Sequence, residues 1–110
     1  MKPKQSSLEY VRLAWLIEVR TRNQKPSLAT KLLLVFLASR ANGTGNSWYG
    51  YAAIGRQTGL SIATINRATR HLKKLGILDW DKGYRNQFEK KTNYYYLNLA
   101  RMRELADLRH

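Results

Sequence analysis

The stretch IGRQTGLSIATINRATRHLKKLGIL, residues 54–78, decides the fold. Gly59 and Gly76 stand where glycine commonly ends a helix, because it adopts left-handed backbone angles without a steric penalty. Ser61 is a good N-cap, since its hydroxyl can accept the free amide N–H groups of a helix start. The spacing therefore predicts a short helix and a longer helix joined by a tight turn, over residues 51–58 and 62–75.

Gly55 fits the same arrangement because it lies four residues before Gly59. Two helices that cross steeply through a short turn leave room there only for a small residue. Apolar stretches on both sides of a polar, charged segment then predict a β-hairpin after the second helix. The other predicted elements are helices over residues 7–21, 28–40 and 100–108 and strands over residues 47–49, 77–80 and 92–99.

This order of elements predicts an α+β fold that is mainly α. It is a winged helix-turn-helix with a small two- or three-stranded antiparallel sheet and extra N- and C-terminal helices. The length of 110 residues favours one domain over residues 1–110.

The second helix of the stretch has an apolar side, with Ile65 and Leu72, and a polar, basic side. An α-helix fits the major groove of B-DNA, and its N-terminal half reaches the base edges. Asparagine pairs with adenine and arginine with guanine, whereas residues at the helix start and end reach the backbone. We expect base contacts from Ala63, Asn66, Arg67 and Arg70, and phosphate contacts from Ser61, Thr64, Lys73 and Lys74.

The hairpin loop predicted over residues 81–91, DKGYRNQFEKK, is a candidate wing on the DNA backbone or in the minor groove. A narrow minor groove attracts arginine, so Arg85 is the best candidate for insertion. The proposed wing residues are Tyr84, Arg85, Asn86, Lys90 and Lys91.

The net charge of +13 supports a polyanionic partner. The chain has no cysteine and two histidines, which excludes disulfide scaffolds and thiolate metal sites, and we expect neither a metal nor another cofactor. No constellation of catalytic residues is recognisable, so we expect a protein that is not an enzyme. The longest apolar run, residues 32–38, is too short for a membrane span, which favours a cytoplasmic location, associated with the nucleoid or a plasmid.

The runs KLLLVFLASRANGTG, residues 31–45, and 54–78 resemble the winged helix-turn-helix family found in plasmid and phage replication initiators. The family pattern matches Ser61 to Thr64, Arg67-Ala68 and Gly76-Ile77-Leu78, and the resemblance covers about residues 27–99. Gly55 replaces the usual alanine, and Ile62 and Ala63 stand where the family often has polar or basic residues. The resemblance implies double-stranded DNA as partner, at an origin of replication or of conjugative transfer. A transcriptional regulator of the same fold and a structured-RNA or ribosome-associated protein stay open, as do a homodimer and other replication or transfer proteins as partners.

The aromatic residues raise a second question, because exposed rings can stack on single-stranded bases. We predict instead that Trp15, Trp48 and Trp80 lie in the core. Tyr95 should face opposite to Tyr94 and Tyr96, since side chains alternate along a strand. His71 is interpreted as a surface side chain.

Overall fold

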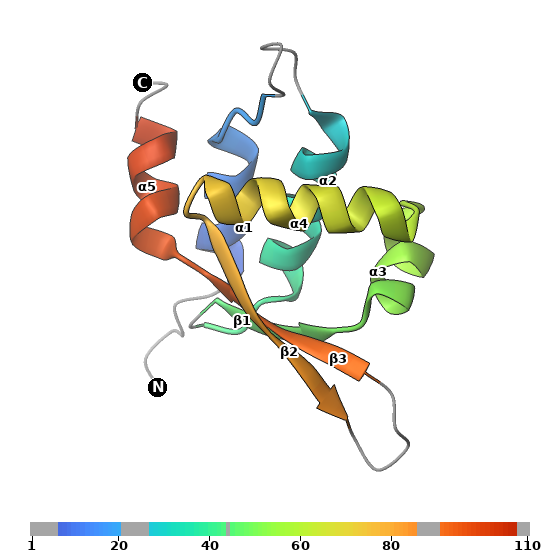
Figure 1. Ribbon diagram of the computed structural model, residues 1–110. Helices are drawn as coiled ribbons and strands as arrows, with labels where there is room; N and C mark the ends of the chain where they lie inside the picture. The colour runs from blue at the N-terminus through green and yellow to red at the C-terminus, as the bar shows by residue number, and fades with distance from the viewer. Residues whose placement is uncertain (1–6, 21–26, 44, 86–90, 108–110) are drawn as a thin grey trace.

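The computed structural model describes residues 7–20, 27–43, 45–85 and 91–107 (Figure 1). Within them the chain forms a mainly helical structure with a small antiparallel sheet, and the predicted α+β winged helix-turn-helix fold is confirmed. The elements in order are α1 (Ser7–Leu16), α2 (Leu28–Arg40), β1 (Asn46–Tyr49), α3 (Tyr51–Thr58), α4 (Ile62–Lys74), β2 (Leu78–Arg85), β3 (Lys91–Leu97) and α5 (Leu99–Asp107).

The turn between α3 and α4 follows from the residues that punctuate it. Gly59 has a left-handed backbone, with φ of 80°, and its N–H donates to the carbonyl oxygen of Gly55 at 2.8 Å. The Ser61 hydroxyl accepts the N–H of Thr64 at 3.2 Å and so caps α4. A Cβ on Gly55 would lie 3.0 Å from the carbonyl oxygen of Leu60, which explains the requirement for a small residue there.

The sheet has the strand order β1-β3-β2, and both pairs are antiparallel. β2 extends well past its predicted end at residue 80, and β3 covers residues 91–97 rather than 92–99. The ribbon continues past an irregularity between Asp81 and Tyr84 and pairs Arg85 with Lys91. The prediction of a loop over all of residues 81–91 is therefore wrong at both ends. A two-stranded ribbon pairs through its backbone, so its polar composition did not reveal the strands.

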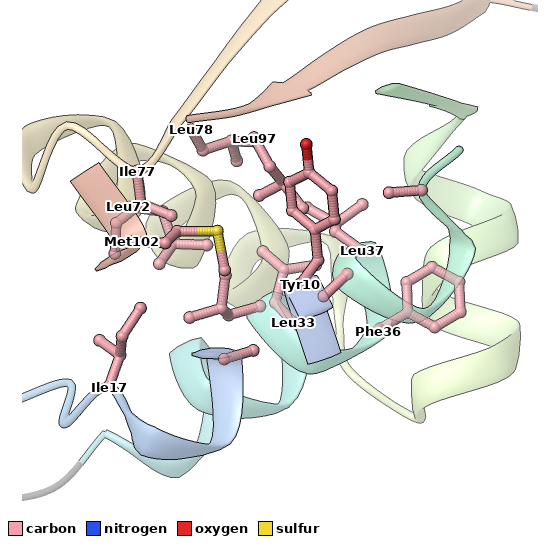
Figure 2. Close-up of a cluster of buried hydrophobic side chains, with 14 of the residues drawn as sticks. Tyr10, Ile17, Leu33, Phe36, Leu37, Leu72, Ile77, Leu78, Leu97 and Met102 are labelled. Atoms are coloured by element: carbon pink, nitrogen blue, oxygen red, sulfur yellow. The ribbon is translucent and has the colours of Figure 1, made fainter. Parts of the chain in front are cut away.

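The core joins side chains from every layer of the molecule (Figure 2). Tyr10 of α1, Leu33 and Leu37 of α2, Leu72 of α4 and Met102 of α5 are each at most 3% exposed. The helices α1 and α5, outside the helix-turn-helix stretch, thus complete the core.

The predicted end of the first helix, residue 21, is wrong, because α1 stops at Leu16. Lys31 of α2 donates from Nζ to the carbonyl oxygens of Trp15 and Ile17, at 2.6 Å each. A lysine that binds these carbonyls satisfies acceptors left free at a helix end. Burial lowers the pKa of Lys31.

Two of the three tryptophans do not lie in the core as predicted. Trp15 is 63% exposed and Trp48 is 55% exposed, whereas Trp80 is half-buried. In β1 the residue that points inward is Ser47, which pairs with the fully buried Tyr95. Side chains alternate along a strand, so Trp48 must point outward. Tyr95 faces opposite to Tyr94 and Tyr96, as predicted, and it is the one of the three that is fully buried.

Candidate nucleic-acid interface

Helix α4 is held in place by one side and exposes the other. Its buried residues are Ile65, Ala68, Thr69 and Leu72, and the Thr69 hydroxyl also lies 3.4 Å from the Tyr51 hydroxyl of α3. In Figure 1, α4 crosses the middle of the molecule with the β2–β3 hairpin extending away from it. The helix therefore exposes one side along its length, which is apolar at Ile62 and Ala63 and basic from Arg67 to Lys74.

The exposed side of α4 carries one stripe of residues at spacings of three and four. Ala63, Arg67, Arg70 and Lys74 are all exposed and follow one another on this outward line. None of these cations has an ion pair among the side chains that the structure describes. Their charges are thus available to a polyanion.

The start of α4 is tied together by its own side chains. The Ser61 hydroxyl donates to the Thr64 hydroxyl at 2.9 Å, and Arg67 Nη2 donates to the same oxygen at 3.3 Å. This chain of hydrogen bonds orients Arg67 along the helix. The first amides of a helix lack intrahelical partners, so those of Ile62 and Ala63 are suited to an anion.

Lys73 is placed differently from the other predicted phosphate contacts. Its Nζ lies 3.3 Å from Asp79 Oδ1 and 5.0 Å from the centre of the Trp80 ring, both on β2. Lys73 is therefore partly neutralised within the protein, whereas Lys74 is not.

Asn66 and Arg70 line a depression of about 420 Å³ beside α4. Ile62 and Ala63 of α4 line it as well, and its remaining walls come from Gly50 and Tyr51 at the start of α3 and from Asn93 of β3. The predicted site residues did not include Tyr51 or Asn93. Asn93 donates to the Tyr95 hydroxyl at 3.0 Å, and only the strand register brings it next to α4.

His71 is half-buried rather than a surface side chain, so that interpretation is wrong. Its Nδ1 lies 3.3 Å from the Thr30 hydroxyl of α2. Burial, and to a lesser extent the charge of Lys74, lowers the pKa of His71 below its usual 6.5. His71 thus joins α4 to α2 at the flank of the outward stripe.

Three of the five proposed wing residues lie on the described part of the β2–β3 hairpin. Tyr84 and Arg85 end β2, and Lys91 begins β3. Asn86 and Lys90 lie outside the described residues. Helix α3 adds two exposed polar side chains that the predicted site did not include, Arg56 and Gln57. Gln57 accepts a hydrogen bond from Arg40 of α2 at 2.8 Å.

Comparison with known families adds one observation to this geometry. Residues 27–78 match a helix-turn-helix domain family. The matched segment is a little under half of the chain and runs from the cap of α2 to the first residue of β2. Neither the curated proteins nor the solved structures give a significant match to the chain.

The match supports a helix-turn-helix DNA-binding family and DNA as the partner of this segment. Two features are absent from the described part of the chain. No helix there is both long and apolar enough to cross a bilayer, and no group of three or more potential metal-binding side chains comes together there.

Proposed function

We propose that the protein binds double-stranded DNA with sequence preference, by inserting α4 into the major groove. The observation that carries the proposal is the outward stripe of α4, Ala63, Arg67, Arg70 and Lys74, which is exposed, basic and free of internal ion pairs among the described residues. The opposite side of the same helix is anchored in the core. A helix fixed in this way can enter a groove without rearrangement.

The position of each residue along α4 suggests its role. Asn66 is suited to adenine, and Arg67 and Arg70 to guanine, because their donors and acceptors match the edges of these bases. Ala63 can contact a thymine methyl group. The remaining predicted contacts, Ser61, Thr64, Lys73 and Lys74, would hold the phosphate backbone.

The hairpin supports a second contact beside the groove. Arg85 pairs with Lys91, so the β2–β3 ribbon extends as far as these two residues. We assign Tyr84, Arg85, Asn86, Lys90 and Lys91 to contacts with the flanking backbone or minor groove. Arginine in a narrow minor groove also senses DNA shape.

The proposed setting is an origin of replication or transfer on a plasmid or phage. This part rests on the resemblance of residues 31–45 and 54–78 to replication initiators. Selection of bound fragments from random duplex DNA tests it, and repeated half-sites in the output would also give the stoichiometry. A site inside the promoter of the protein's own gene, with none in an origin, would favour transcriptional regulation instead.

The division of roles on α4 is tested by paired variants. Arg67→Ala should relax the preference at one base position, whereas Lys74→Ala should weaken binding to all sequences about equally. Circular dichroism should show both variants folded, since both side chains are exposed. Identical effects of the two changes would refute the division, and a preference for folded RNA over duplex DNA would refute the DNA proposal.

A further inference from the structure

The outer face of the sheet carries an aromatic surface that the DNA proposal does not use. The register of the strands aligns Trp48, Tyr94 and Asp81 in one row across β1, β3 and β2. The next row on the same face is Asn46, Tyr96 and Asp79. We call Trp48, Tyr94, Tyr96, Asp79 and Asp81 the aromatic–acidic face.

The rings of this face form an ordered group. Trp48 and Tyr94 are parallel, with ring centroids 4.3 Å apart, and Tyr96 lies 4.7 Å from Tyr94. Trp48 is nevertheless 55% exposed. A stacked, exposed aromatic surface of this kind is typical of binding sites, because it offers large apolar contact with little loss of side-chain freedom.

The charge of the face differs from that of the rest of the protein. Both of its charged residues are carboxylates, although the chain has a net charge of +13. Asp79 and Asp81 are exposed, and Asp81 has no ion pair among the described side chains. A phosphate backbone would be repelled here, which argues against single-stranded nucleic acid as the occupant.

The protein itself shows how such a surface holds a cation. Lys73 places its Nζ 3.3 Å from the carboxylate of Asp79 and 5.0 Å from the centre of the Trp80 ring. Carboxylate and aromatic ring thus act together on one lysine at the edge strand β2, with the Trp80 ring on the opposite side of the strand from Asp79. Asp81 pairs with Tyr94 in the strand register, on the same face as the Tyr94–Trp48 stack, and has no ion pair among the described side chains.

We propose that the aromatic–acidic face docks an arginine- or lysine-bearing segment of a protein partner. The cationic groups would lie on Trp48 and Tyr94 and pair with Asp81, while α4 remains free to bind DNA. This surface and the outward stripe of α4 belong to different elements that both point away from the core. The proposal does not depend on the DNA-binding proposal.

The test uses the full chain and a blocked peptide of four arginines spaced by glycines. A matched peptide with citrulline in place of arginine keeps the shape and removes the charge. The indole N–H signals in a ¹H–¹⁵N NMR spectrum report the location, with Trp15 and Trp80 as internal controls for Trp48. Fluorescence anisotropy of the labelled peptide reports the affinity, and a ten-nucleotide thymidine oligomer is the nucleic-acid probe.

The arginine peptide should shift the Trp48 indole signal saturably, and the citrulline peptide should bind much more weakly. Trp48→Ala should weaken arginine-peptide binding about tenfold and Asp81→Asn about threefold, since both ring and carboxylate contribute. Duplex DNA binding should stay unchanged in Trp48→Ala, which lies outside the proposed DNA contacts, and this separates the result from the DNA proposal.

Three results would overturn the proposal. The first is equal binding of the two peptides, and the second is a shift of the Trp48 signal by the thymidine oligomer rather than the arginine peptide. The third is a concentration-dependent dimer that Trp48→Ala dissociates, because the occupant would then be a second copy of the chain. An unchanged peptide affinity in Asp81→Asn, a surface variant expected to fold normally, would also contradict it.

Discussion

Two glycines with nearly the same backbone conformation provide a sharp test of the packing. Gly59 has φ of 80° with nothing within 4 Å of an added Cβ. Gly45 has φ of 85°, but an added Cβ would lie 2.9 Å from Cε1 of Tyr10 and 3.0 Å from the carbonyl oxygen of Leu97. Alanine at either position has the same cost for a left-handed backbone, about 1 kcal/mol. Only Gly45→Ala adds overpacking, which typically costs about 1–3 kcal/mol.

We therefore expect Gly59→Ala to lower the free energy of unfolding by about 1 kcal/mol and Gly45→Ala by about 3 kcal/mol. For a chain of this size the corresponding decreases in Tm are about 4 °C and about 12 °C. Urea unfolding and thermal unfolding, both followed by circular dichroism, measure the two quantities. Equal destabilisation of the two variants would refute the close approach of Tyr10 to Gly45.

Three further predictions concern α4. Leu72→Ala should lower the free energy of unfolding by about 2–5 kcal/mol because it leaves a cavity in the core. Ile62→Ala, at a side chain that is 58% exposed, should change this free energy by less than about 0.5 kcal/mol. Similar values for the two variants in urea titrations would be inconsistent with the burial of Leu72. Because folding lowers the pKa of His71, the unfolded chain binds a proton at this histidine more readily than the folded chain does. The free energy of unfolding should therefore fall as the pH drops below about 6.5, and His71→Gln should lessen this fall. Urea midpoints of both proteins at about pH 5 and about pH 7 measure the difference. Arg70→Ala should reduce the slope of log affinity for duplex DNA against log salt concentration by about one. Arg103→Ala on α5, where Arg103 is paired with Glu9 at 2.7 Å, should leave this slope unchanged. Equal reductions in the two variants would indicate an effect of net charge rather than a direct phosphate contact of Arg70.

The parts of the fold that could be predicted depend on local backbone chemistry. Ser61 and Gly59 fixed the ends of α3 and α4 because a cap and a left-handed residue act within one turn of chain. The end of α1 could not be predicted, since Lys31 from another helix binds its last carbonyls. The exposure of Trp48 depends on which side of the sheet is covered, and that is a tertiary property.

The candidate site divides in the same way. The outward stripe of α4, with Arg67 and Arg70, follows from helical periodicity alone. The neutralisation of Lys73 by Asp79 and the approach of Asn93 to α4 depend on how the strands pair. Sequence patterns give no strand register for residues so far apart in the chain.

The contact of α1 with the rest of the core has a consequence for dissecting this protein. Tyr10 covers Gly45, and Ile17 and Met102 fill the core from outside the segment that matches the known domain family (Figure 2). A recombinant fragment cut at residues 27 and 78 would expose these apolar contacts to water and lose the partner strand of β1. Such an excised segment should aggregate or stay unfolded. The segment that matches the domain family is therefore shorter than the segment that folds cooperatively.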